Sequence, residues 1–195
     1  MRGNRQRWSA GRWAALSTVA VALTLIAIST SMAYPETAVT LRVIGPSAPV
    51  QAGQQFNVEV RVEGASNLGA LEFQYVFNSL VASATADNIR LGSFLGSTGR
   101  TTGELRLAAA PSAPHQPLYG AYSYGSAAGP NGAGQLVTIT MSAVSAGTSV
   151  LNLQDVQVTS INGTPIQATI APGAVQVVGA SNIRRLYLPT MMRFR

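Results

Sequence analysis

Hydrophobic and polar residues alternate along most of the chain, and the clearest run begins at Gly69. One side of this run carries the large apolar residues Leu71, Phe73, Tyr75 and Phe77. The other side carries the smaller or more polar residues Ala70, Glu72, Gln74 and Val76. A period of two is typical of a β-strand with one buried face. Four large apolar side chains on one face predict a strand that packs against a second sheet.

Similar alternation recurs elsewhere, between turn signals rich in glycine, proline and asparagine. These predicted strands cover residues 37–44, 54–63, 104–108, 118–124, 135–144, 149–153, 156–161 and 174–178. In the segment 54–63, Phe56 is expected to point inward, and Glu59 and Glu63 outward. Beyond residue 33, no segment has a helical period. Eight or nine short strands at this spacing predict an all-β sandwich or barrel.

The first 33 residues have the organisation of a secretory signal peptide. Four arginines accompany an apolar run at residues 13–28, and Ser31-Met32-Ala33 follows with small residues at its first and third positions. The apolar run is shorter than the roughly 20 residues that a membrane-spanning helix needs. We therefore predict cleavage after Ala33, a single β-domain over residues 34–179 and a C-terminal tail over 180–195. A retained membrane anchor is the alternative.

Positive charge is concentrated at the two ends of the chain. The formal net charge is +6, but residues 34–179 hold five arginines against seven acidic residues, a net charge of −2. A nucleic-acid-binding module gathers basic charge on its folded face, so the sequence argues against a nucleic-acid partner. Cysteine is absent, so the domain has no disulfide and relies on its hydrophobic core.

Residues that usually carry catalysis or bind metals are scarce. The only histidine, His115, lies in the proline-rich segment 111–117, and no Gly-x-Ser-x-Gly motif is present. One histidine without cysteine excludes the usual zinc sites, and no calcium-binding loop is found. The acidic residues occur singly along alternating strands, which is typical of solvent-facing positions. We expect no catalytic residue, no metal and no cofactor.

Three blocks of sequence follow one another along the chain. They are Asn67-Leu68-Gly69-Ala70-Leu71-Glu72-Phe73, then Leu91-Gly92-Ser93-Phe94-Leu95-Gly96-Ser97-Thr98-Gly99-Arg100, then Gly129-Pro130-Asn131-Gly132-Ala133-Gly134-Gln135-Leu136 with Ala143-Val144-Ser145-Ala146-Gly147-Thr148-Ser149. In this order and spacing, the three blocks resemble the cohesin domain. The resemblance spans residues 39–178. It implies a nine-stranded jelly-roll sandwich, related to bacterial cellulose-binding modules. It also implies a secreted or cell-surface, non-catalytic role in bacteria, in which cohesins hold dockerin-bearing enzymes on polysaccharide-degrading assemblies or cell surfaces.

The resemblance also indicates where a dockerin would bind. Cohesins offer contacts on the outward face of the strand that matches residues 69–77, so the predicted partner-binding residues are Ala70, Glu72, Gln74 and Val76. Family members commonly carry Asn and Asp where this chain has Ala70 and Glu72, and they often have Tyr-Asp-Pro in place of Phe77-Asn78-Ser79. Glu72 is the one charged residue of this set.

Two other functions stay open on the sequence. The first is direct binding of a polysaccharide, with Tyr119, Tyr122 and Tyr124 as stacking residues, although alternation makes at least one of Tyr119 and Tyr122 face inward. The second is a structural role at the cell surface or in adhesion. The segment 182–195 mixes arginines with apolar residues, which suits attachment to an anionic surface or a sorting partner. A disordered end is the alternative for this tail.

Overall fold

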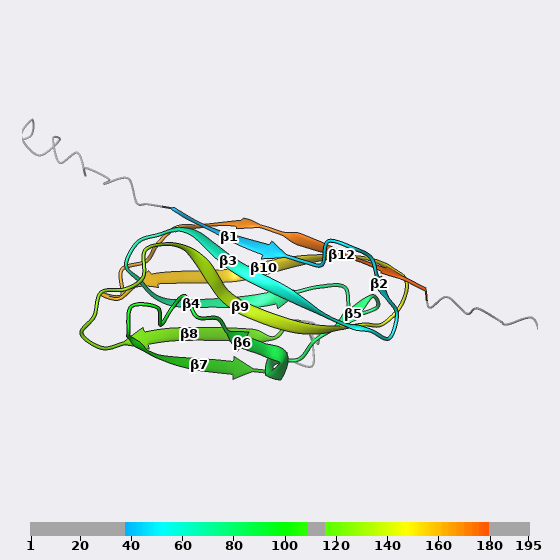
Figure 1. Cartoon of the computed structure of the whole chain (residues 1–195), viewed down its shortest axis with the longest axis horizontal. Coiled ribbons are helices and arrows are strands. Elements are labelled where there is room, and N and C mark those ends of the chain that lie inside the picture. The colour runs from blue at the N-terminus through cyan, green and yellow to red at the C-terminus, as the bar shows by residue number, and fades with distance from the viewer. Residues whose placement is uncertain (1–37, 109–115, 180–195) are drawn as a thin grey trace, which may run out of the picture. The chain divides into compact units, whose positions relative to one another are not determined.

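The structure is a computed structural model that describes residues 38–108 and 116–179, which form two six-stranded β-sheets (Figure 1). The first sheet contains, in spatial order, β11 (Ala168–Ala171), β1 (Val39–Ile44), β3 (Gln55–Ala65), β9 (Gly132–Ala143) and β5 (Ala82–Ser83), with β6 (Ile89–Leu91) also paired to β9. The second contains β2 (Val50–Gln51), β12 (Gly173–Val178), β10 (Gly147–Ser160), β4 (Leu68–Val76), β8 (Leu118–Tyr124) and β7 (Thr101–Leu107). A short 3-10 turn, η1 (Ala86–Asn88), precedes β6. The predicted all-β sandwich is confirmed.

The inward faces of the two sheets form the hydrophobic core, and β4 contributes several of its large side chains. Leu71, Phe73 and Tyr75 are buried, and Phe77 is buried just beyond the end of the strand. The rings of Phe73 and Tyr119 lie 5.5 Å apart between centroids, on the neighbouring strands β4 and β8. The first sheet meets these residues with buried valines of β3 and apolar residues of β9. The register predicted for the central strand is therefore confirmed.

The strands differ from the prediction along β10. The sequence predicts two strands, at 149–153 and 156–161, whereas the structure has one strand interrupted by a β-bulge. Its pairing with β4 shifts between Gln154 and Gln157, and Asp155 has a φ of 48°. Aspartate tolerates this left-handed conformation better than most residues, so it suits the bulge that joins the two predicted strands into one. The strands β2, β5, β6 and β11 were not predicted, because runs of two to four residues are too short to show alternation.

Hydrogen bonds join parts of the three blocks that resemble cohesins. The amide of Leu68 donates to the carbonyl of Pro130, and the amide of Gly129 donates to Oδ1 of Asn67. The amide of Gly92 donates to the carbonyl of Leu136 at 2.6 Å. These hydrogen bonds therefore hold the three blocks together, although the blocks lie far apart in the sequence.

Several predictions concern residues outside the described ranges. They are the signal peptide at residues 1–33, the histidine at position 115 and the tail at 182–195. Within residues 38–108 and 116–179, no helix is long and apolar enough to cross a membrane.

Candidate functional site

The outward face of the second sheet brings the predicted partner-binding residues together with two neighbouring strands. The register pairs Glu72 of β4 with Gly120 of β8 and with Gln157 of β10. In an antiparallel sheet, paired residues point to the same side. The side chains of Ala70, Glu72, Gln74 and Val76 therefore lie on the same face of the sheet as the outward-facing residues of β8 and β10. All four are partly exposed. Figure 1 shows β4, β8 and β7 following one another towards the lower edge of the sandwich.

Apolar and aromatic side chains gather on the part of this face formed by β7 and β8. Leu105, Leu107, Tyr122 and Tyr124 are between 46% and 55% exposed. They account for half of the large exposed hydrophobic side chains in the described part of the chain. The prediction missed Leu105 and Leu107. The alternation of residues 104–108 was visible in the sequence, but the expected exposure of Glu104 assigned the two leucines to the inside.

A hollow of about 370 Å³ lies in the middle of this face. Its lining includes Ala70, Glu72, Leu105, Gly120, Tyr122 and Gln157. Gly120 explains the hollow, because it carries no side chain in a row where Leu105 stands on one side and Glu72 on the other. A methyl group on Gly120 would have its nearest neighbours at 3.8 Å, an ordinary contact distance, so it would fit there without a clash.

The three tyrosines proposed for carbohydrate stacking do not share one surface. Tyr119 is fully buried, and its hydroxyl donates to Oε1 of Glu104 at 2.9 Å. Burial raises the pKa of Tyr119 to about 12. Tyr119 therefore cannot stack on a glycan, because its ring packs against Phe73 between the sheets. Tyr122 and Tyr124 are exposed, with ring centroids 6.3 Å apart and planes inclined by 31°.

Glu104 was expected to face the solvent, and that expectation is wrong. Its carboxylate lies on the inward side of β7, where it accepts hydrogen bonds from the Tyr119 hydroxyl and the Leu91 amide and pairs with Arg106. The Arg106 Nε in turn donates to the carbonyl of Ile89 at 2.9 Å. Because Leu91 and Ile89 belong to β6, this cluster joins the edge of the second sheet to the first. Its role is structural.

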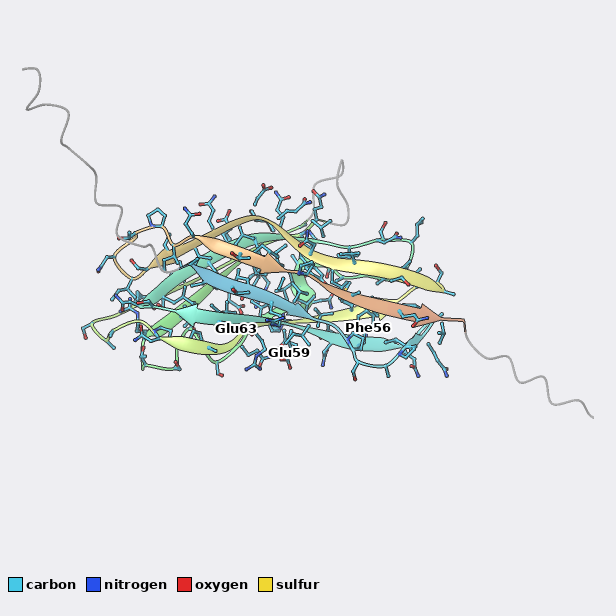
Figure 2. The ribbon with its side chains drawn as sticks, turned by 90° about the horizontal axis from the view of Figure 1, so that it is seen from above. Phe56, Glu59 and Glu63 are labelled. Atoms are coloured by element: carbon cyan, nitrogen blue, oxygen red, sulfur yellow. The ribbon has the colours of Figure 1, made fainter. Side chains whose placement is uncertain are left out.

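The outward face of the first sheet has a different character. Arg42 and Glu63 form an ion pair at 3.0 Å, and Arg61 lies 3.7 Å from Glu59. The hydrogen bond from Arg42 holds the pKa of Glu63 below its usual value. Glu59 and Glu63 lie along β3 in Figure 2. The positive and negative charges on this face balance each other in pairs, as they commonly do on solvated sheet surfaces.

The second sheet has few charged residues. Glu72 is on its outward face, Asp155 is at the bulge, and Glu104 and Arg106 point inward. Among the described residues, no arginine lies within ion-pair distance of Glu72. A surface poor in charge and bearing tyrosines has the composition of the centre of a protein interface. Residues 38–108 and 116–179 contain no group of three acidic, histidine or cysteine residues placed to hold a metal ion.

Comparison with known proteins shows that the fold is that of the cohesin modules. One solved structure is a non-cellulosomal cohesin from the archaeon Archaeoglobus fulgidus, with a TM-score of 0.57, 16% identity, and coverage of 72% of this chain and 91% of that chain. Another is a type I cohesin–dockerin complex from Clostridium thermocellum, with a TM-score of 0.59, 11% identity, and coverage of 73% and 94%. A third is the seventh ScaB type I cohesin from Pseudobacteroides cellulosolvens, with a TM-score of 0.56, 12% identity, and coverage of 81% and 99%. No protein-family model and no curated protein matches the sequence.

Proposed function

We propose that this chain is a secreted, non-catalytic module that binds a dockerin-bearing protein through the outward face of β4, β8 and β7. The observation that carries the proposal is the contrast between the two outward faces. One carries two ion pairs, whereas the other is poor in charge and exposes Tyr122 and Leu105 around a hollow. Exposed aromatic and apolar side chains with few charges favour a specific protein contact.

The solved structures support the choice of partner. The structure from Clostridium thermocellum is a cohesin–dockerin complex, and others of the same fold were likewise solved as complexes with a dockerin. Glu72 lies on the strand where the sequence resemblance to cohesins places dockerin contacts. Its carboxylate would meet a cationic or hydroxyl group of the partner. Partner recognition differs from that of other cohesins at Ala70, which offers no hydrogen bond.

Calorimetry against dockerins encoded in the same genome tests this proposal. We expect Glu72→Ala to weaken binding at least tenfold, because removing one member of a buried charged contact costs about 2–5 kcal/mol. Glu63→Ala is the matched control, because it removes a carboxylate from the opposite face. Equal affinities for the wild type and Glu72→Ala would place the contact elsewhere.

Direct carbohydrate binding is the second candidate, and the exposure of Tyr122 and Tyr124 favours it. The 31° inclination between their rings and the burial of Tyr119 leave no flat platform of three rings. Soluble and insoluble polysaccharides therefore belong in the same calorimetric series. Binding to cellulose or xylan that is lost in Tyr122→Ala, without any dockerin binding, would replace the proposed function by this one.

Export and surface attachment complete the proposal. Cleavage after Ala33 would release the β-domain outside the cell, where dockerin-bearing enzymes act on polysaccharides. The tail at 182–195, with four arginines among apolar residues, would attach the module to an anionic surface. Glutamine in place of these arginines should release the protein from the cell-surface fraction into the medium.

A further inference from the structure

The hollow above Gly120 has walls of three different chemical kinds. Leu105 offers an aliphatic wall, Tyr122 an aromatic one, and Glu72 a carboxylate on the far side. Gln157 and Thr159, which also line the hollow, add an amide and a hydroxyl next to Glu72 and Ala70 on the neighbouring strand. A ligand group that fits all of these surfaces needs an apolar stem, a positive charge and several hydrogen-bond donors.

From this arrangement we propose that the hollow is the anchor site for an arginine side chain of the protein partner. This inference rests on the proposed function and names the part of the partner that this face recognises. The aliphatic stem would pack against Leu105, while the guanidinium would meet the Glu72 carboxylate. The five N–H donors of a guanidinium suit a carboxylate that has an amide oxygen and a hydroxyl beside it. The ring of Tyr122 adds a cation–π contact.

Charge complementarity decides between arginine and a neutral occupant. On this sheet, the carboxylates outside the Glu104–Arg106 cluster are Glu72 and the bulge residue Asp155, and no described arginine pairs with Glu72. A neutral side chain in the hollow would bury the Glu72 carboxylate without a partner, which is costly. An arginine compensates for this cost and forms charge-assisted hydrogen bonds.

Gly120 provides a way to fill the hollow without disturbing the fold. Its nearest neighbours would lie 3.8 Å from an added methyl group, and its backbone does not need a left-handed conformation. Gly120→Val places a branched side chain in the hollow, and valine is well suited to a strand. Glu72→Gln is the second variant, because it removes the charge and preserves the shape. Glu63→Gln on the opposite face is the control.

An NMR titration of the ¹⁵N-labelled protein tests the inference without a dockerin. The probes are N-acetyl-arginine methylamide and its citrulline analogue, which has nearly the same shape and no charge. We expect the arginine probe to shift the amide signals of Gly120, Tyr122 and Leu105, and the citrulline probe to bind about tenfold more weakly. Gly120→Val should abolish the shifts, Glu72→Gln should remove the preference for arginine, and Glu63→Gln should change nothing.

The outcomes separate this inference from the proposed function. Equal binding of the two probes, or shifts that survive Gly120→Val, would overturn the arginine site. A dockerin that binds Gly120→Val as tightly as the wild type would also overturn it, while leaving the proposed function intact. Arginine-specific binding without any dockerin binding would support the arginine site and would reject a dockerin as the partner. The double variant Arg184→Gln/Arg185→Gln tests whether an arginine of this chain occupies the hollow. If it shifts the same amide signals in the absence of probe, the chain's own tail fills the hollow, and the proposal that a partner's arginine binds there would be overturned.

Discussion

The ring of Tyr122 covers Gly103, the residue opposite it on the neighbouring strand. A methyl group added to Gly103 would lie 2.5 Å from Cζ of Tyr122, well inside van der Waals contact. An aromatic ring over a cross-strand glycine stabilises an edge pair, because it covers backbone that has no side chain of its own. The missing side chain of Gly103 therefore sets the position of Tyr122 beside the hollow.

Gly103→Ala should displace Tyr122 and leave the fold intact. The ring is half exposed, so its outer end can rotate away from an added methyl group. Alanine is also acceptable in a strand, and we expect the free energy of unfolding to change by less than about 1 kcal/mol. The measurement is the set of NMR contacts between the Tyr122 ring and residue 103, together with affinity for the arginine probe. Gly120→Ala should keep the ring in place, and unchanged Tyr122 contacts in Gly103→Ala would contradict the prediction.

A second prediction compares two adjacent residues of β4 that face opposite ways. Phe73 is fully buried against Tyr119, whereas Glu72 lies on the outward face. Phe73→Ala should lower the free energy of unfolding by roughly 3–5 kcal/mol, because it leaves a cavity in the core. Glu72→Ala should change it by less than about 0.5 kcal/mol. Urea unfolding of both variants checks this, and similar losses would mean that the register of β4 is wrong.

The third prediction compares two arginines. Arg100 is buried, and its guanidinium donates to the carbonyls of Ser123, Gly125 and Ala127 and to the hydroxyl of Ser123. Arg100→Met leaves those carbonyls without donors, so we expect a loss of roughly 2–4 kcal/mol in unfolding free energy. Arg100→Lys should recover little, because an ammonium cannot reproduce the fork of donors.

Arg42 provides the control for this comparison. It forms an exposed ion pair with Glu63, and exposed pairs contribute little to stability. Arg42→Met should therefore unfold at nearly the same urea concentration as the wild type. If the two methionine variants lose similar stability, Arg100 does not hold the loop at residues 123–127 in the way its hydrogen bonds indicate.

The core of this fold could be predicted well from the sequence, because the alternation of apolar and polar residues along each strand indicates which side chains point inward. Leu71, Phe73 and Tyr75 were assigned to the inside on periodicity alone, and all three are buried. The same rule placed Phe56 inward and Glu59 and Glu63 outward, and the structure agrees. Periodicity of two is reliable for long strands, since every residue adds to the same pattern.

The candidate site was only partly predictable. Alternation found the outward set on β4, but it could not show that Gly120 and Leu105 lie next to Glu72, because strand pairing joins residues that are far apart in sequence. Glu104 was misread for a related reason. Its short strand at the sheet edge allows an inward carboxylate to reach the Leu91 amide and the Tyr119 hydroxyl, and only tertiary structure reveals those partners.

The fourth prediction concerns processing. If residues 1–33 are a signal peptide, the exported protein begins at Tyr34. Intact-mass analysis of material recovered outside the cells checks this directly. A mass that still includes residues 1–33 would favour the alternative of a retained membrane anchor.

The last prediction concerns stability at alkaline pH and depends on Tyr119. Burial raises the pKa of this residue to about 12 in the folded protein, whereas an unfolded tyrosine titrates near pH 10. A group whose pKa is raised by folding contributes stability that is fully present below the unfolded pKa. That stability is lost as pH rises towards the folded pKa. The protein should therefore lose stability progressively between about pH 10 and pH 12.

Tyr119→Phe isolates this contribution, because the other buried tyrosine, Tyr75, whose pKa is also raised by burial, is retained. At neutral pH the variant should be less stable by about 0.5–1.5 kcal/mol, since it lacks the hydrogen bond to Glu104. Above pH 10 the wild type should lose stability faster than the variant, because only the wild type must keep Tyr119 protonated in order to stay folded. Urea unfolding at a series of pH values measures the difference. Parallel curves for the two proteins from pH 7 to pH 12 would show that Tyr119 ionises as easily when folded as when unfolded, which its burial between Phe73 and Glu104 should prevent.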